Sequence, residues 1–314
     1  MGQRDEDFTR RRYAVRHRTI YTYDGDVEAC LERGFLRPRE TASQQVLATE
    51  LVVSPDPDLI SEHVDLFGNH SSFLEVRTPH TRLEVRKESL VEVAWPRVDV
   101  EALNRWTVAS AVQAIADADA DPVEATTFRL PSPLIELGPE VRAYAVTILP
   151  PERPLGEAIT ALYHDIYRGF SYKKGATSVR TTLPELLGTR AGVCQDFAHL
   201  AIGCLRSVGF PARYVSGYIE TASPPGRPKL EGSDASHAWA SVLVPDGTWV
   251  DLDPTNDHLA DSRYIVTAWG RDFRDVSPLK GVVFTEAANS TLEVAVDVIR
   301  VTSPDADSGW PALS

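Results

Sequence analysis

The first hundred residues show the alternation of apolar and polar positions that is typical of β-strands. β-Branched and aromatic side chains gather in stretches separated by turn-forming residues, among them DGD after the first stretch and FGN within the third. The pattern predicts strands at residues 12–23, 46–58, 63–80 and 82–96. Short strands at this spacing indicate a β-sandwich-like domain.

Helical periodicity replaces this alternation after residue 100. Apolar positions there recur every three or four residues, which predicts amphipathic helices. The predicted helices cover residues 100–119, 156–172, 184–192 with a stop at Gly188, and 194–208. Alternation returns at residues 281–301, which are predicted to form the last strands.

These patterns predict an α+β fold. Its second part is a core in which helices pack on an antiparallel sheet, and the C-terminal strands are assigned to this core. The predicted parts are an N-terminal β-rich domain at residues 1–100, a helical and proline-rich connection at 101–150, the core at 151–302 and a mobile tail at 303–314.

Composition narrows the class of protein. With 43% hydrophobic and 25% charged residues, the 314-residue chain has the make-up of a soluble globular protein. A net charge of −13 argues against nucleic acid or an anionic membrane as the main partner. Three cysteines do not make a disulfide framework, and the charged N-terminus lacks the apolar stretch of a signal peptide. We therefore expect a cytoplasmic location.

Cys194 opens the predicted helix CQDFAHLAIGCLRSV. The unpaired N–H groups and the dipole at a helix N-terminus favour an anion. A thiolate, the nucleophilic form of cysteine, is therefore favoured at this position. Alone, this placement is also compatible with ordinary packing, so a catalytic assignment needs a base from elsewhere in the chain.

Other cysteines and histidines have plainer interpretations. Cys204 lies on the apolar face of the same helix, and both it and Cys30 are predicted to be core residues. His199 is five residues from Cys194, about 140° around the helix, so it is not its partner base. A metal site of Cys194, His199 and His237 is disfavoured for the same reason, and no cofactor is expected.

Residues 236–254 predict a hairpin that brings a histidine to an aspartate. SHAWASVLV and TWVDLDP alternate on either side of the turn PDG. If residues 245–247 form the loop, Trp239 faces Asp253, and His237 is its diagonal neighbour at about 7–8 Å between α-carbons. If the register of the hairpin is shifted by two residues, His237 and Asp253 lie directly opposite each other. Asp251 shares the face and is the rival partner, but Pro254 stiffens the strand end beside Asp253.

The motifs GVCQDFAHL, GFPARYVSGYI, SHAWASV and WVDLDPTN follow in order and resemble the transglutaminase-like superfamily, which has a papain-like core. YAVRHRTIYTYDGDV and DLFGNHSSFLEV are similar to the N-terminal β domain of its bacterial members. The resemblance implies a catalytic triad of Cys194, His237 and Asp253. It also implies acyl transfer from an amide through a thioester, on a protein or peptide substrate and without a metal.

The sequence departs from the family at the oxyanion site. No tryptophan lies shortly before Cys194, and Gly188 stands where papain-like enzymes have glutamine. Tyr172 and Gln195 are the candidates for that role. Three readings stay open: transfer to an amine, hydrolysis by a cysteine peptidase or amidase, and a binding scaffold without catalysis.

Overall fold

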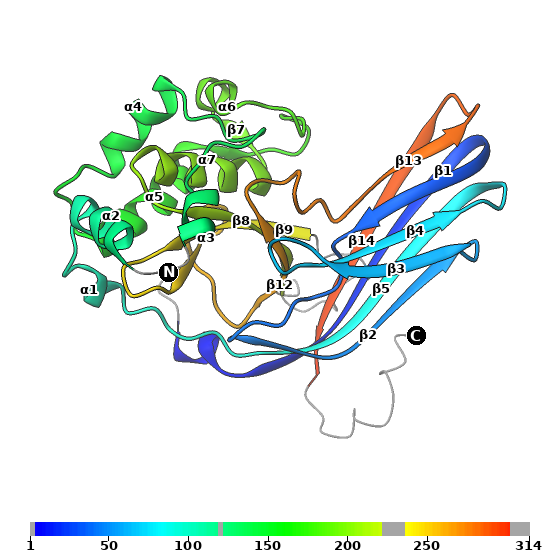
Figure 1. Ribbon diagram of the computed structural model, residues 1–314, viewed down its shortest axis with the longest axis horizontal. Helices are drawn as coiled ribbons and strands as arrows, with labels where there is room; N and C mark the ends of the chain where they lie inside the picture. The colour runs from blue at the N-terminus through cyan, green and yellow to red at the C-terminus, as the bar shows by residue number, and fades with distance from the viewer. Residues whose placement is uncertain (1–3, 119–121, 222–235, 302–314) are drawn as a thin grey trace, which may run out of the picture.

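The computed structural model describes residues 4–118, 122–221 and 236–301, and the tail predicted at 303–314 lies outside them. Helices gather on one side of the molecule and long strands on the other (Figure 1), which confirms an α+β fold. A short 3₁₀-helix, η1 (Asp5–Phe8), precedes the first strand.

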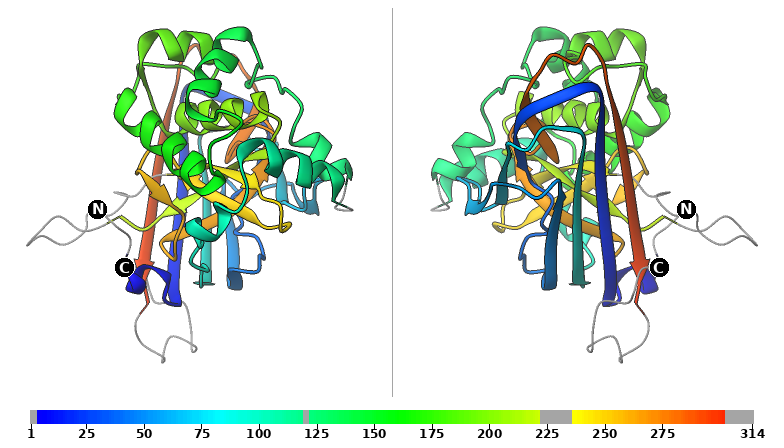
Figure 2. Two further views of the ribbon diagram at one scale, coloured as in Figure 1. Left: turned by 90° about the vertical axis from the view of Figure 1, so that its left-hand side faces the viewer. Right: turned by 90° about the vertical axis from the view of Figure 1, so that its right-hand side faces the viewer.

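The long strands form one curled, seven-stranded antiparallel sheet rather than two facing sheets. The right-hand view of Figure 2 shows it from the face remote from the helices, with β1 beside β14. Its strands are β1 (Arg11–Gly34), β2 (Gln44–Ser54), β3 (Leu59–Val64), β4 (His70–Val76), β5 (His80–Val93), β13 (Leu279–Thr285) and β14 (Ser290–Arg300).

β1 is twice as long as the pattern predicts. The turn expected at residues 24–26 is instead a register shift within the strand, between Thr22 and Val27. The first half of β1 pairs with β5 and β14, and its second half pairs with β4 and β13. Partners on both sides keep the strand extended through turn-forming residues. β13 and β14, which the sequence assigned to the core, therefore lie in the N-terminal sheet.

Seven helices are present in the described residues. They are α1 (Val100–Leu103), α2 (Val108–Asp117), α3 (Pro122–Thr127), α4 (Pro139–Ile148), α5 (Leu155–Gly169), α6 (Leu183–Thr189) and α7 (Cys194–Ser207). The single helix predicted at 100–119 is two helices, because Asp99 caps the first and Thr107 caps the second. None of these helices has the length and apolarity that crossing a bilayer requires.

The helices pack on a second sheet of five antiparallel strands. Its order is β11-β10-β9-β8-β12, and α7 lies against β9 and β8. The strands are β8 (Ala212–Ile219), β9 (Ser236–Leu243), β10 (Trp249–Asp253), β11 (His258–Leu259) and β12 (Tyr264–Gly270). Two short parallel strands, β6 (Ser171–Tyr172) and β7 (Ala191–Gly192), precede α7.

The two sheets share a buried apolar contact. Tyr13 and Val15 of β1 pack in one cluster with Tyr218 of β8 and Ile265 of β12. The Tyr13 hydroxyl also donates a hydrogen bond to the backbone oxygen of Ser262. The N-terminal sheet thus supports the edge of the core sheet that lies farthest from β10 and β11.

Candidate active site

Cys194 is the first residue of α7, as the sequence predicts, and it is half-buried. The Asp196 carboxylate fixes this helix end by accepting bonds from the Val193 N–H at 2.8 Å and the Thr177 hydroxyl at 2.7 Å. A side chain at Gly192 would lie 2.8 Å from that carboxylate, so glycine is needed in the approach to the helix.

Cys30 and Cys204 are fully buried, as predicted. Burial raises the pKa of the Cys30 thiol to about 11 and that of Cys204 well above its ordinary range. Neither can supply a thiolate near neutral pH. Cys194 is the cysteine that a solute can reach.

The hairpin has the first of the two predicted registers. Leu243 pairs with Trp249 and Ala240 pairs with Leu252, which leaves His237 and Asp253 as diagonal neighbours. The His237 Nε2 lies 2.6 Å from the Asp253 Oδ2. The side chain of His237 is 8% exposed and that of Asp253 is fully buried.

Both oxygens of Asp253 accept hydrogen bonds. Oδ2 accepts from His237, from the Asn256 amide at 2.7 Å and from the Tyr264 hydroxyl at 2.5 Å. Oδ1 accepts from the backbone N–H groups of Thr255 at 2.8 Å and Asn256 at 3.2 Å. Burial alone would raise the pKa of Asp253, but His237 and these donors hold it well below its ordinary value. The carboxylate therefore stays ionised.

His237 is held between this carboxylate and the thiol of Cys194. Burial by itself would lower the pKa of His237, but the charge and hydrogen bond of Asp253, together with a hydrogen bond to Cys194, raise it to about 10. Since Nε2 bonds Asp253, Nδ1 is the nitrogen available to the sulfur. The three residues that the sequence singles out are thus brought together, with His237 bonded to Asp253 and close to Cys194.

The rival carboxylate has a different environment. Asp251 accepts a bond from the Trp239 indole N–H at 2.8 Å and another from the Ser241 hydroxyl. The Trp239 indole, which this bond fixes, stacks on the His237 ring, with centroids 6.1 Å apart. Asp251 therefore contacts the imidazole only through Trp239. A side chain at Gly217, opposite His237 on β8, would lie 2.8 Å from that indole.

The two oxyanion candidates lie beside Cys194. Tyr172 on β6 is 52% exposed, and its ring meets Phe197 edge-on at 6.4 Å. Burial and the nearby Cys194 sulfur raise the pKa of Tyr172, so its hydroxyl remains a donor. Gln195 is half-buried at the second position of α7. An oxyanion role for either residue stays a prediction.

His199 points away from the thiol. Its Nε2 accepts a hydrogen bond from the Phe273 N–H at 3.2 Å, and its ring contacts Tyr214 at 5.0 Å. Burial lowers the pKa of His199 to about 4, which makes it neutral at pH 7. Across the described ranges, no three histidine, cysteine or acidic side chains are grouped as a metal site would require.

Three residues of the site escaped the sequence reasoning. Asn256 belongs to the DPTN motif, so its contact with Asp253 had a signal in that motif. The position of Asp196, three residues after the N-cap of α7, could have indicated its capping role. Tyr264 lies eleven residues after Asp253 on another strand, and no pattern in the sequence indicates its contact with Asp253.

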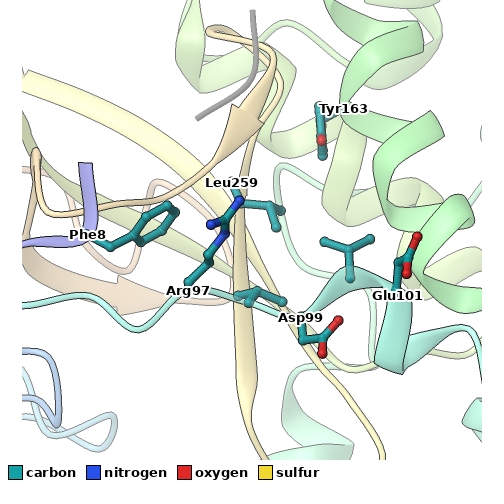
Figure 3. A pocket seen from close by; sticks show the side chains of 8 residues that line it. Phe8, Arg97, Asp99, Glu101, Tyr163 and Leu259 are labelled. Atoms are coloured by element: carbon teal, nitrogen blue, oxygen red, sulfur yellow. The ribbon is translucent and has the colours of Figure 1, made fainter. Parts of the chain in front are cut away.

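A separate groove lies where the N-terminal segment meets α1, α5 and β11. Arg97 lies between Phe8 and Leu259, and Tyr163 and Glu101 stand farther along (Figure 3). The groove is lined by Phe8, Arg97, Val98, Asp99, Val100, Glu101, Tyr163 and Leu259. It therefore includes none of the residues around Cys194.

Two family profiles match the chain. That of the bacterial transglutaminase-like N-terminal region covers residues 13–92, and that of the transglutaminase-like superfamily covers residues 142–254. The second range contains Cys194, His237 and Asp253. These three residues therefore fall inside the segment that the superfamily shares.

Two relatives and one solved structure agree with these matches. An uncharacterised protein of Mycobacterium bovis is 43% identical over 296 residues, 92% of each chain. A protein-glutamine gamma-glutamyltransferase of Pseudomonas aeruginosa is 28% identical over 164 residues, 51% of this chain and 24% of that protein. A crystal structure of a suggested cysteine protease from Cytophaga hutchinsonii is 21% identical, with a TM-score of 0.73, over 92% of this chain and 91% of that one. The last match shows a shared fold.

Proposed function

Because the chain belongs to the transglutaminase-like superfamily, we propose that it is a cysteine-dependent enzyme that transfers the acyl group of an amide through a thioester on Cys194. The arrangement of His237 between the Asp253 carboxylate and the Cys194 thiol carries this proposal. It supplies a nucleophile, a base and a group that orients the base.

The first half-reaction forms the thioester. Because the pKa of His237 is raised to about 10, the imidazole already carries a proton near neutral pH, and the Cys194 sulfur attacks the amide carbonyl carbon as a thiolate to give a tetrahedral oxyanion. The imidazolium is stabilised by Asp253 at 2.6 Å and donates its proton to the leaving nitrogen. The C–N bond then breaks, ammonia or an amine departs, and the acyl group stays on sulfur.

The second half-reaction releases the acyl group. His237 accepts a proton from the incoming nucleophile, which attacks the thioester carbonyl and releases the Cys194 thiolate beside the protonated imidazole. An amine acceptor gives a new amide bond, whereas water gives a carboxylic acid. The matched relatives bear names of both kinds, a glutamyltransferase and a cysteine protease, so both acceptors enter the test.

One assay separates these outcomes. Glutamine peptides are incubated with the protein, with and without a fluorescent primary amine, and ammonia release and amine incorporation are measured. Incorporation supports transfer, ammonia release alone supports hydrolysis, and cleavage of the peptide backbone supports a peptidase. Cys194→Ala should abolish all three. Cys204→Ser is unsuitable as a control because Cys204 is in the core, so Tyr167→Phe, an exposed change on α5, serves instead.

Alkylation of the thiol provides a test that needs no substrate. Cys194 should react with iodoacetamide at lower pH than a free thiol does, and this advantage should disappear in His237→Gln. Mass spectrometry identifies the alkylated cysteine. Equal reactivity in both proteins across the pH range would leave a binding scaffold as the better account.

A further inference from the structure

The segment that follows β6 forms a basic border beside Cys194. Residues 171–182 read SYKKGATSVRTT and contain three cations and no acid, in a chain whose net charge is −13. Lys173, Lys174 and Arg180 are all exposed. Elsewhere arginines are commonly paired with carboxylates, as Arg16 is with Glu88 at 2.8 Å. No such pair engages these three cations within the described ranges.

Hydrogen bonds attach this segment to the start of α7. The Lys173 N–H donates to the backbone oxygen of Gly192 at 2.8 Å, two residues before Cys194. The Thr177 hydroxyl donates at 2.7 Å to the Asp196 Oδ2, the atom that also accepts the Val193 N–H. The basic segment is thus joined to the same carboxylate that fixes the helix end carrying the nucleophile.

Position and charge act together here. The N-terminus of α7, which has a partial positive charge and bears the Asp196 carboxylate, lies beside the segment that carries Lys173 and Lys174. Charges within about 8 Å still interact at physiological salt, a distance of roughly two or three residues along an extended peptide. A peptide whose amide reaches Cys194 therefore places its neighbouring residues within the field of this segment.

We propose that the acyl donor is an acidic peptide, with carboxylates within two or three residues of the amide that Cys194 attacks. This inference rests on the proposed function and specifies its substrate class. Lys173 and Lys174 bind the donor carboxylates by charge, and they take no part in the chemical step. They should therefore affect KM rather than kcat.

Three pentapeptides with a central glutamine test the proposal. The four flanking residues are glutamates in the first, glycines in the second and lysines in the third. For the wild-type protein we expect kcat/KM to be about three- to tenfold higher for the acidic than for the neutral peptide, and lower again for the basic one. These ratios correspond to one or two exposed ion pairs. The preference should shrink as the NaCl concentration rises.

Charge reversal gives the matched comparison. Lys173→Glu/Lys174→Glu should abolish or invert the preference for the acidic over the neutral peptide. Arg82→Glu/Arg86→Glu makes the same change in net charge on β5 of the other sheet and should preserve the preference. Equal kcat/KM for the three peptides in the wild-type protein would overturn the inference.

Peptide binding separates this inference from the proposed function. Binding of the three labelled peptides to Cys194→Ala is measured by fluorescence anisotropy, which requires no turnover. Tighter binding of the acidic peptide, lost in the lysine double variant, supports the basic border even if no peptide is processed. If the wild-type protein turns peptides over but neither binding nor kcat/KM depends on peptide charge, the proposed function stands and this inference fails.

Discussion

The hydrogen bond from Tyr264 to Asp253 is the contact whose removal tests the site most selectively. Tyr264 and Asp253 are both fully buried, and their oxygens are 2.5 Å apart. Burial and the Asp253 charge raise the pKa of Tyr264 well above its ordinary value, so its hydroxyl is a donor at every working pH. Tyr264→Phe removes this donor and retains the ring that packs on Trp239 and His237.

The structure sets the expected magnitude. A hydrogen bond to a charged group stabilises a protein by about 1.5–3 kcal/mol. His237 and Asn256 still donate to the same carboxylate oxygen in the variant, so Asp253 keeps partners. We expect the free energy of unfolding to fall by about 1.5–3 kcal/mol at pH 7. The variant should remain folded.

The pH dependence of this loss of stability shows whether the Tyr264 hydroxyl bonds an ionised carboxylate or only packs against it. The pKa of Asp253 is depressed in the folded protein, so its contribution is present above the unfolded value near 3.9 and is lost as the pH falls through the folded value. The difference between wild type and Tyr264→Phe should therefore narrow under acid. The stability difference is measured by urea unfolding at pH 7 and at the lowest pH at which both proteins fold.

A second buried tyrosine gives the control. The Tyr218 hydroxyl bonds the neutral His17 ring at 3.1 Å, and burial lowers the pKa of that histidine to about 4. Tyr218→Phe should cost about 0.5–1.5 kcal/mol, without a change in kcat. Losses of the same size in both variants, with kcat unaltered in each, would refute the reasoning that Tyr264 acts on the ionised Asp253.

Four further substitutions probe the hairpin of β9 and β10 and the neighbouring strand β8. Asp253→Asn should lower kcat by about 10³–10⁴-fold by mis-setting the imidazole tautomer, whereas Asp251→Asn should lower the thermal midpoint and largely spare kcat; the reverse assignment would contradict the hydrogen bonding seen here. Gly217→Ala should destabilise the protein by at least about 1–3 kcal/mol in urea unfolding, because its Cβ would lie 2.0 Å from a backbone oxygen of β12; an unchanged midpoint would show that β8 can shift. His237 has a pKa raised to about 10, so its contribution is complete below its unfolded value near 6.5 and is lost as the pH rises toward 10. The stability gap between wild type and His237→Gln should therefore close over that range, and a constant gap would count against the ion pair.

The parts of the site that sequence could predict are those set by local rules. Cys194 was placed at a helix start by the periodicity that follows it and the small residues before it. The loop at residues 245–247 and strict alternation on either side limited the hairpin register to two alternatives, and both of them bring His237 close to Asp253. Each of these inferences spans fewer than about 20 residues, where chain geometry leaves few alternatives.

The parts that could not be predicted depend on partners far along the chain. Residues 24–26 have the composition of a turn, yet β1 continues through them because β13 and β14, more than 250 residues later, pair along both of its halves. The contact between Tyr264 and Asp253 exists only in the assembled core sheet, where β12 pairs with β8 and β10 lies on the other side of β9. Such pairings follow from assembly of whole sheets, and no local pattern specifies them.

The choice between Asp251 and Asp253 shows where the two kinds of information meet. Alternation places both carboxylates on the same face of β10, so position alone leaves the choice open. The two oxygens of Asp251 are occupied by Trp239 and Ser241, whereas Oδ2 of Asp253 accepts His237. Asp251 therefore fixes the indole that stacks on the imidazole, and Asp253 sets its charge and orientation. Exchanging their functions would require Trp239 to leave the His237 ring, which its full burial in the sheet core prevents.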